Sequence, residues 1–299
     1  MADCLPTKQS GLPVLHGSHG RRWRENVYVY PVVSRRSGGL SIGINLNPDK
    51  ACNFDCIYCQ VDRQTPPVVR DVDLRVLEQE LRGMLHAATQ GSLFEGPPFD
   101  AAPPRLRAVR DIAFSGDGEP TTSPVFAESV ELAAALRSEF GLTEAKLVLI
   151  TDACYLTRPA VARGLEIMDR NHGEIWAKLD AGTEDYYRLV NRPNVPLATV
   201  LDNILVASRV RPIVIQSLWM RVRGEPPGTA EITAFVSRLR AILSSGGQIK
   251  LVQVYTVARR PAERYVTALP PDELKAIADR VLGETGLPAQ VYGGYEPPE

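Results

Sequence analysis

The chain has few cysteines and no long apolar segment, and both absences restrict what it can be. Its 299 residues include five cysteines, an odd number that does not fit a closed disulfide framework. No positively flanked apolar stretch opens the sequence, and no window approaches the roughly 18 consecutive apolar residues that a membrane helix needs. We therefore predict a protein of the reducing cytoplasm that does not act on a membrane.

The sequence also lacks an excess of charge of either sign. Its 34 Lys and Arg residues and 35 Asp and Glu residues leave a net charge of −1. Such a balance gives no global attraction to nucleic acid, so a basic binding surface would have to be local. There is no internal repeat and no segment long enough for a second module. With 44% hydrophobic residues, the chain is long enough to bury one large core.

Three of the five cysteines, Cys52, Cys56 and Cys59, lie in a C-x3-C-x2-C arrangement after the apolar run 40–46. A loop of this length can direct three thiolates to one point, whereas half-cystines so close could hardly all find separate disulfide partners. A closed zinc or iron site needs four ligands, and no fourth cysteine lies nearby. Thiolate ligation favours an iron-sulfur cluster or zinc, and we predict a [4Fe-4S] cluster. The alternatives are a zinc site that adds Cys154 or a histidine, and reduced thiols without a function.

The spacing C-x3-C-x-aromatic-C, with Tyr58 as the aromatic residue, resembles the signature of the radical SAM superfamily. The resemblance implies that Cys52, Cys56 and Cys59 hold three irons, and that the fourth iron binds S-adenosylmethionine (SAM) at a site to which Tyr58 contributes. It implies reductive cleavage of SAM to a 5'-deoxyadenosyl radical that takes a hydrogen atom from a substrate. An electron donor such as flavodoxin or ferredoxin would then be a partner.

The run 31–36, which ends in Ser34-Arg35-Arg36, resembles the branch of that superfamily similar to wybutosine-type tRNA-modifying enzymes. Arg35 and Arg36 could hold a carboxylate or phosphate, or be surface arginines without a function. The candidate substrates are therefore an anionic molecule or an RNA, although neutral net charge and the lack of a recognisable RNA-binding module weigh against RNA. An alternative from another class is a non-catalytic iron-sulfur or zinc protein.

Apolar patterning predicts strands that alternate with helices. The predicted strands are 40–46, 106–114, 146–151, 174–179, 212–220 and 249–257, and the predicted helices are 72–90, 124–140, 159–168, 184–190, 197–210, 229–243 and 271–284. This alternation indicates an α/β protein with a parallel sheet, and it matches the partial (β/α)6 TIM-like barrel that the resemblance implies. We predict a flexible N-terminal arm over 1–26 that includes Cys4, a radical SAM core domain over 27–292, and a tail over 293–299.

Sites in barrels of this kind lie at the C-terminal ends of the strands. The strand 106–114 leads into Gly116-Asp117-Gly118-Glu119, where two glycines allow the backbone to approach a ligand closely. Gly118 and Glu119 resemble the family's Gly-Gly-Glu element, which cups the amino group of SAM, with Asp117 in place of the first glycine.

Other strand ends supply further candidates. By position, Thr151 and Lys178 match places where similar enzymes touch the SAM ribose and carboxylate, although Thr151 could merely satisfy a strand-end amide. Asp180 could cap the following turn. Cys154 could face the cavity as a hydrogen donor to a substrate radical, or pack as a small apolar residue. Four arginines could line a mouth suited to an anionic substrate or be solvated rim charges: Arg221, Arg223, Arg259 and Arg260.

Overall fold

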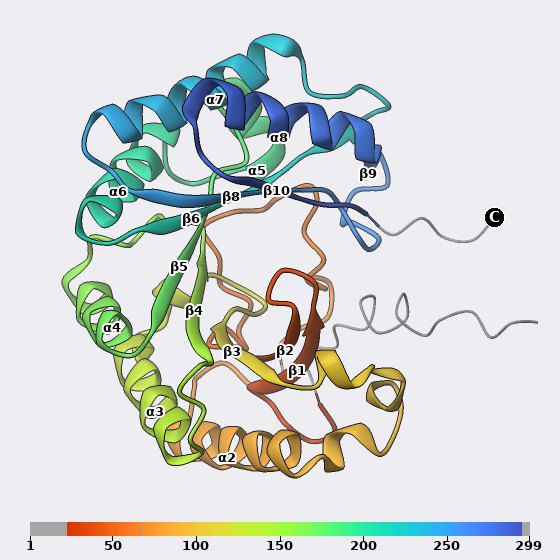
Figure 1. The fold of residues 1–299 in the computed structure, drawn as a ribbon, viewed down its shortest axis with the longest axis vertical. Coiled ribbons are helices and arrows are strands. Elements are labelled where there is room, and N and C mark those ends of the chain that lie inside the picture. Colours follow the sequence, from red (N-terminus) through yellow and green to blue (C-terminus); the bar gives the residue numbers. More distant parts are fainter. Residues whose placement is uncertain (1–22, 68, 295–299) are drawn as a thin grey trace, which may run out of the picture.

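One curled sheet of eight strands organises the molecule (Figure 1). The computed structural model describes residues 23–67 and 69–294, so most of the predicted arm, including Cys4, and residues 295–299 of the predicted tail lie outside the described residues. The strands are β1 (Val29–Ser34), β2 (Gly39–Ile44), β3 (Val109–Phe114), β4 (Lys146–Thr151), β5 (Gly173–Lys178), β6 (Ile213–Leu218), β8 (Ile249–Tyr255) and β10 (Ala289–Tyr292).

The six predicted strands pair in parallel in the order β2-β3-β4-β5-β6-β8. One strand is added at each edge: β1 pairs antiparallel with β2, and β10 pairs parallel with β8. Within the described residues β1 and β10 do not pair with each other, so the barrel stays open on one side. The predicted α/β fold, a partial TIM-like barrel, is confirmed, and the two edge strands are additions to it.

Helices cover the outer face of this half-barrel (Figure 1). They are α2 (Leu74–Gln90), α3 (Phe126–Glu139), α4 (Pro159–Arg170), α5 (Glu184–Asn191), α6 (Leu197–Val210), α7 (Thr229–Ser244) and α8 (Pro271–Thr285), with short 3-10 turns at Ser92–Phe94, Phe99–Ala101, Pro104–Leu106 and Pro120–Thr122. The ends of α2 follow from its flanking residues, because Asp73 caps the first turn and Gly91 adopts the left-handed conformation after the last. None of the described helices is long and apolar enough to cross a membrane.

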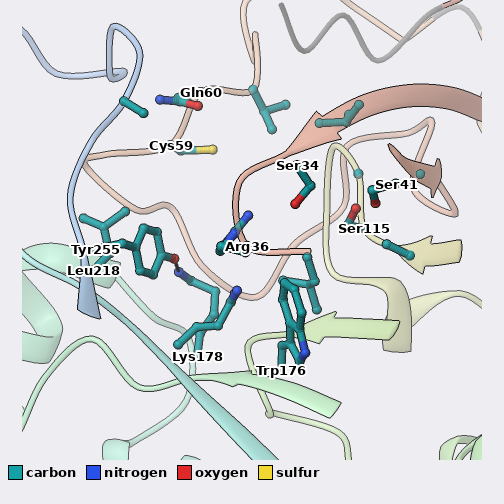
Figure 2. Close-up of a pocket in the computed structure, with 18 of the residues that line it drawn as sticks. Ser34, Arg36, Ser41, Cys59, Gln60, Ser115, Trp176, Lys178, Leu218 and Tyr255 are labelled. Atoms are coloured by element: carbon teal, nitrogen blue, oxygen red, sulfur yellow. Dashed lines mark hydrogen bonds between the residues drawn. The ribbon is translucent and has the colours of Figure 1, made fainter. Parts of the chain in front are cut away.

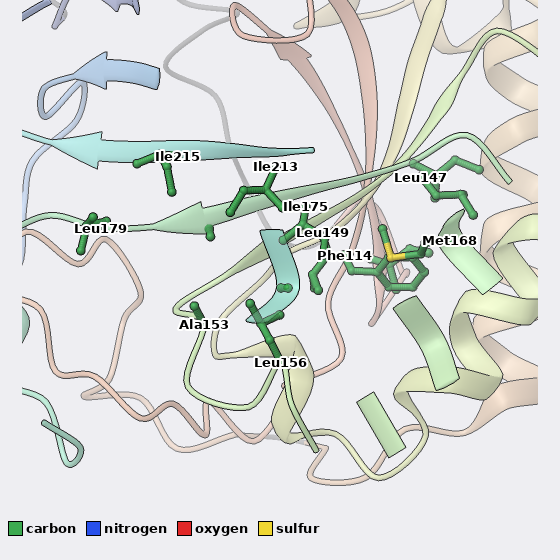
Figure 3. Packing of buried hydrophobic residues seen from close by; sticks show 14 of the residues in the cluster. Phe114, Leu147, Leu149, Ala153, Leu156, Met168, Ile175, Leu179, Ile213 and Ile215 are labelled. Atoms are coloured by element: carbon green, nitrogen blue, oxygen red, sulfur yellow. The ribbon is translucent and has the colours of Figure 1, made fainter. Parts of the chain in front are cut away.

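Successive strand residues point to opposite faces of the sheet. Phe114, Leu147 and Ile175 face the helices and belong to the main hydrophobic core (Figure 3). Val148 and Trp176 belong to a smaller apolar cluster of the inner face. A short two-stranded sheet, β7 (Met220–Val222) with β9 (Val266–Ala268), follows the end of β6. Because side chains of the large sheet alternate between its two faces, the inner face is free to line a cavity.

The hairpin of β1 and β2 ties the open side of the half-barrel to its neighbours. The carboxylate of Glu80 in α2 accepts hydrogen bonds from the backbone amides of Val27, Tyr28 and Val29. In the hairpin turn, Arg35 donates from Nη1 to the carbonyl oxygen of Gly293, 2.6 Å away and directly after β10. A side chain therefore spans the gap between the two edge strands.

Candidate functional site

A cavity of about 330 Å³ lies inside the half-barrel (Figure 2), within the size range of small-molecule sites. It is lined by the cysteine loop, by the C-terminal ends of the parallel strands and by the β1–β2 turn. Every predicted site residue except Cys154 lines it: Cys52, Cys56, Tyr58, Cys59, Gly118, Glu119, Thr151 and Lys178. The fold therefore gathers residues that are far apart in the sequence around one space.

The cysteine loop follows β2 and rests on the C-terminal end of α5. The amides of Asp55 and Ile57 donate to the carbonyl oxygens of Asn191 and Val190, each over 3.0 Å. The three cysteines of the loop are free and only partly buried, whereas Cys154 is fully buried. The loop is thus held by backbone contacts that leave its thiols available to the cavity.

The surroundings of the thiols both oppose and support their ionisation. Burial raises the pKa of Cys52 to about 11 and that of Cys56 to about 12. Asn191 donates from Nδ2 to the Cys56 sulfur over 3.4 Å. Burial would lower the pKa of Arg63, but the adjacent sulfurs of Cys59 and Cys52 raise it. Two donors, Asn191 and Arg63, therefore stand ready to stabilise thiolates.

Among residues 23–67 and 69–294, no group of three or more His, Cys, Asp or Glu side chains is arranged to hold a single metal ion. A cluster in which each cysteine binds a different iron is larger than one ion. The three thiols of the loop fit such a group, because they line one cavity without a fourth cysteine beside them.

Gly118 brings the loop after β3 into contact with the cysteine loop. A Cβ atom at Gly118 would lie 1.9 Å from the carbonyl oxygen of Ala51, and the amide of Glu119 donates to that same oxygen over 3.1 Å. The glycine is required for this contact with the residue before Cys52, and the close approach of a ligand predicted for it stays a prediction. Gly116 similarly makes room for Asn45, whose Oδ1 accepts from the Asp117 amide over 3.1 Å.

Glu119 is buried, and its carboxylate is fixed by the ends of β3 and β4. Its Oε1 accepts from the Thr121 amide at 3.1 Å, the Thr121 hydroxyl at 2.5 Å and the Thr151 hydroxyl at 2.7 Å. Its Oε2 accepts from the Asp152 amide at 2.7 Å. Burial and the neighbouring Asp152 charge raise the pKa of Glu119 to about 8. Thr151 thus orients a carboxylate in this structure.

Lys178 belongs to a second buried network beneath the cysteine loop. Its Nζ lies 3.3 Å from Asp180 Oδ2 and donates to the Tyr255 hydroxyl over 2.9 Å. The hydroxyl of Tyr58 donates to Asp180, and so does Asn191 Nδ2 over 3.0 Å. The network connects the end of β5 to Tyr58, the aromatic residue of the cysteine motif.

Part of this network was not predicted from the sequence. Asp180 accepts hydrogen bonds within the network, while the cap of α5 is Thr183, so the suggested capping role of Asp180 is wrong. Asn191 and Arg63 carried no recognisable signal, because Asn191 ends a helix distant in sequence and Arg63 follows the motif without a fixed spacing.

Cys154 lies outside the cavity. It is 5% exposed and belongs to the main hydrophobic core together with Ala153 and Leu156. Its amide donates to Asp152 Oδ1 over 2.9 Å. This position supports the packing alternative and gives no support to a hydrogen-donor role.

The four arginines of the suggested mouth do not act together. Arg259 lines the cavity. Arg221 forms an ion pair with Glu273. The Arg223 guanidinium group lies over a tyrosine ring, 5.4 Å from its centroid. Arg260 does not line the cavity. Only one of the four arginines is therefore placed to meet a ligand there.

An open parallel half-barrel with three cysteines in a loop at the C-terminal ends of its strands agrees with the fold that the resemblance to the radical SAM superfamily implies. Two solved structures share this fold. Spore photoproduct lyase, a cysteine-to-alanine mutant with dinucleoside spore photoproduct, is 11% identical with a TM-score of 0.56, over 90% of this chain and 80% of that one. SuiB of Streptococcus suis, bound to S-adenosylmethionine, is 12% identical with a TM-score of 0.53, over 87% and 49%. These two likenesses show the shared fold, and that fold is the one implied by the resemblance to the superfamily.

The relatives found by sequence match this chain over only part of their own length. UPF0026 protein MJ1312 of Methanocaldococcus jannaschii is 30% identical over 175 residues, 58% of this chain and 46% of that protein. A UPF0026 protein of Helicobacter pylori (strain 26695) is 23% identical over 247 residues, 82% and 70%. GTPase Obg of Brachyspira hyodysenteriae is 25% identical over 164 residues, 55% and 20%. The chain spans less than half the length of MJ1312 and of this GTPase, and no family model matches it.

Proposed function

We propose that the chain is a radical SAM enzyme in which Cys52, Cys56 and Cys59 bind a [4Fe-4S] cluster. One observation carries the proposal: three free thiols of a single loop line the same cavity as the buried carboxylate of Glu119. When bound, the cluster supplies the electron that cleaves SAM to methionine and a 5'-deoxyadenosyl radical, which abstracts hydrogen from a substrate. The activity needs a one-electron donor such as flavodoxin or ferredoxin, and a reducing cytoplasm suits it.

Glu119 is the acceptor for the SAM ammonium group. A carboxylate can accept about four hydrogen bonds. The Oε1 atom of Glu119 already accepts three, whereas its Oε2 atom accepts only one, from the Asp152 amide. The remaining position on Oε2 suits a cation, and a cation there would favour the ionised form of a group whose pKa burial raises. Thr151 holds this carboxylate in place beside the ribose position.

Lys178 is the candidate partner of the SAM carboxylate. An ammonium group has three donors, of which Asp180 and Tyr255 engage two. The third remains for an anion in the cavity, which Lys178 lines. The ring of Tyr58 helps to hold the Lys178 ammonium group through a cation–π contact, because Nζ lies 4.9 Å from the ring centroid.

Anaerobic reconstitution tests the cluster and the reaction together. We expect roughly four irons and four sulfides per chain, on the stoichiometry of a [4Fe-4S] cluster, and release of 5'-deoxyadenosine when SAM and a reductant are added. Cys56→Ala should lose the cluster and SAM cleavage. Cys154→Ala is the matched control and should retain both, since Cys154 is away from the cavity. Stoichiometric zinc with negligible sulfide would contradict the proposal.

A further inference from the structure

The β1–β2 turn carries Arg36 into the interior of the half-barrel. Its guanidinium carbon lies 5.6 Å from the ring centroid of Trp176 and 5.3 Å from that of Tyr255, and Figure 2 shows it between the two rings. The turn precedes β2, whereas the cysteine loop follows β2. Arg36 and the cysteines therefore reach the cavity from opposite ends of the strands.

Arg36 forms the floor of the cavity. It lines both the cavity and a second hollow at the N-terminal ends of the strands, together with Trp176 and Asp111. Cation–π contacts hold the guanidinium group between two rings without using its N–H donors in hydrogen bonds. The ring contacts thus fix the direction in which those donors point.

No described carboxylate neutralises Arg36. In residues 23–67 and 69–294, no ion pair or hydrogen bond to its guanidinium group is formed. Burial raises the pKa of Asp111 more than the nearby Arg36 charge lowers it, and Asp111 accepts a hydrogen bond from Ser41. Glu174 is already paired with two lysines. The five guanidinium donors therefore lack an acceptor among the described residues.

The two ends of the cavity differ in charge. Three acidic side chains lie after the C-terminal ends of β3 and β4, beside the cysteine loop: Asp117, Glu119 and Asp152. Of the cations of that end, Lys178 and Arg63 already face Asp180 and the cysteine sulfurs, and Arg259 also lines the cavity. At the floor, the β1–β2 turn supplies two cations, Arg35 and Arg36, and burial favours the neutral form of Asp111. A cation such as the SAM ammonium group is therefore favoured near the cysteines, and an anion is favoured at the floor.

A neutral polar group of β6 lines the same cavity. Gln216 lines the cavity, and its Nε2 donates to Gln253 Oε1 over 2.7 Å. Its Oε1 is buried and has no hydrogen-bond partner among the described residues. Buried acceptors are rarely left without a donor. A ligand that supplies an O–H or N–H group would satisfy it.

We propose that Arg36 binds a carboxylate or phosphate group of the substrate, with a neighbouring O–H or N–H of that substrate donating to Gln216. The inference rests on the proposed function, because it assigns the cysteine end of the cavity to SAM and the floor to the substrate. A guanidinium fork matches either oxyanion with two parallel hydrogen bonds. Arg35 also lines the cavity, but it is exposed and donates to the Gly293 carbonyl, whereas Arg36 makes no such bond among the described residues.

Anion titration of the metal-free protein tests this site without requiring SAM chemistry. Inorganic phosphate and acetate are added in separate series at constant ionic strength, and tryptophan fluorescence is recorded because Trp176 contacts Arg36. We expect a saturable response to one or both anions, and the responding series identifies the oxyanion. Arg36→Gln should weaken binding roughly 10- to 150-fold, the loss expected for charge-assisted hydrogen bonds. Arg36→Lys keeps the positive charge but lacks the forked guanidinium donors. Its affinity for the anion should therefore lie between those of the unmodified protein and Arg36→Gln.

Arg75→Gln, at an exposed arginine of α2 that does not line the cavity, is the matched control and should bind the anion like the unmodified protein. The inference would be overturned if neither anion gave a saturable response. It would also be overturned if Arg36→Gln, with an unchanged melting temperature, responded as the unmodified protein does. Cluster-loaded Arg36→Gln should bind SAM with unchanged affinity, and a parallel loss of SAM binding would overturn it in favour of a SAM-carboxylate site. Arg36-dependent anion binding in a protein that cannot assemble a cluster would instead defeat the proposed function.

Discussion

At the scale of single residues, Glu119 illustrates how a strand end prepares a carboxylate for a cation. Its side chain is buried, and four hydrogen bonds from three residues fix its orientation. The same burial disfavours the ionised form of Glu119, and the neighbouring Asp152 charge disfavours it further. A carboxylate under that penalty gains more from a neighbouring ammonium group than a solvated one does.

Removing the Glu119 charge should weaken SAM binding while leaving the cluster intact. We expect Glu119→Gln to lower SAM affinity roughly 10- to 150-fold, because a buried cation loses a charged acceptor. Equilibrium binding of SAM to the cluster-loaded variant measures the effect, and the cluster absorbance serves as its internal control. Unchanged affinity would remove Glu119 from the SAM site.

The same residue makes the metal-free protein sensitive to pH. The folded state raises the pKa of Glu119 from 4.5 to about 8, so folding favours its protonated form. The resulting stability is fully present below pH 4.5 and is lost as the pH rises through about 8. The melting temperature of the unmodified protein should therefore fall relative to Glu119→Gln over that window. A constant difference between the two proteins would contradict the raised pKa.

Asn191 should tune the cluster. It donates to the Cys56 sulfur and to Asp180, and hydrogen bonds to the sulfurs raise the reduction potential of iron-sulfur clusters. We expect Asn191→Leu to lower the potential and to weaken cluster binding roughly 10- to 100-fold, the usual range for partners of metal ligands. A redox titration followed by electron paramagnetic resonance measures the potential. Asn171→Leu, at the end of α4 and bonded to Ile167, is the control.

At the scale of elements, the alternation of strands and helices was predictable, and the edges of the sheet were not. The six parallel strands and all seven helices lie close to their predicted ranges, because long apolar periods dominate each of them. The run around Pro31 was not among the predicted strands, yet β1 forms there as an edge strand, where proline is tolerated. The strand β10 has four residues, too few for a period to be visible.

The site was predictable only where it depends on strand ends. Glu119, Thr151 and Lys178 follow or end strands, so parallel pairing alone brings them together. Asn191 reaches the Cys56 sulfur from a helix end, and Arg36, one of the two arginines suggested as anion ligands, reaches the cavity from a hairpin turn. Their positions depend on how these elements pack against the sheet, and no local pattern records that packing.

Contact between the loop after β3 and the cysteine loop depends on Gly118. Gly118→Ala would place a Cβ atom 1.9 Å from the Ala51 carbonyl oxygen, so the two loops must separate and the Glu119 amide must lose its acceptor. We expect faster hydrogen exchange at that amide and a large loss of SAM cleavage. Gly83→Ala is the control, since a Cβ atom there meets open space in a helix and should stabilise by roughly 0.5–1 kcal/mol. Equal exchange in the two variants would show that the loops do not depend on this contact.

At the scale of the whole molecule, the curvature of the sheet is visible in contacts between strands that are not neighbours. Glu174 is the second residue of β5 and is 5% exposed, and its carboxylate pairs with Lys146 of β4 at 3.1 Å and with Lys250 of β8. Because β6 lies between β5 and β8, the contact with Lys250 crosses the concave interior. Trp176 adds a hydrogen bond to the same carboxylate over 2.7 Å.

Glu174 should therefore stabilise the curved form of the sheet at neutral pH. Burial would raise its pKa, but hydrogen bonds from Lys250 and Trp176 and the charges of both lysines lower it below 4.5. Its contribution is present above pH 4.5 and is lost as the pH falls through the lowered value. We expect Glu174→Gln to cost about 1–3 kcal/mol at neutral pH, measured by denaturant unfolding, with a smaller difference in acid. Lys250→Met combined with Glu174→Gln should cost less than the sum of the two single changes, since both remove the same contact. Additive losses would mean that Glu174 acts on β5 alone and does not hold the two sides of the half-barrel together.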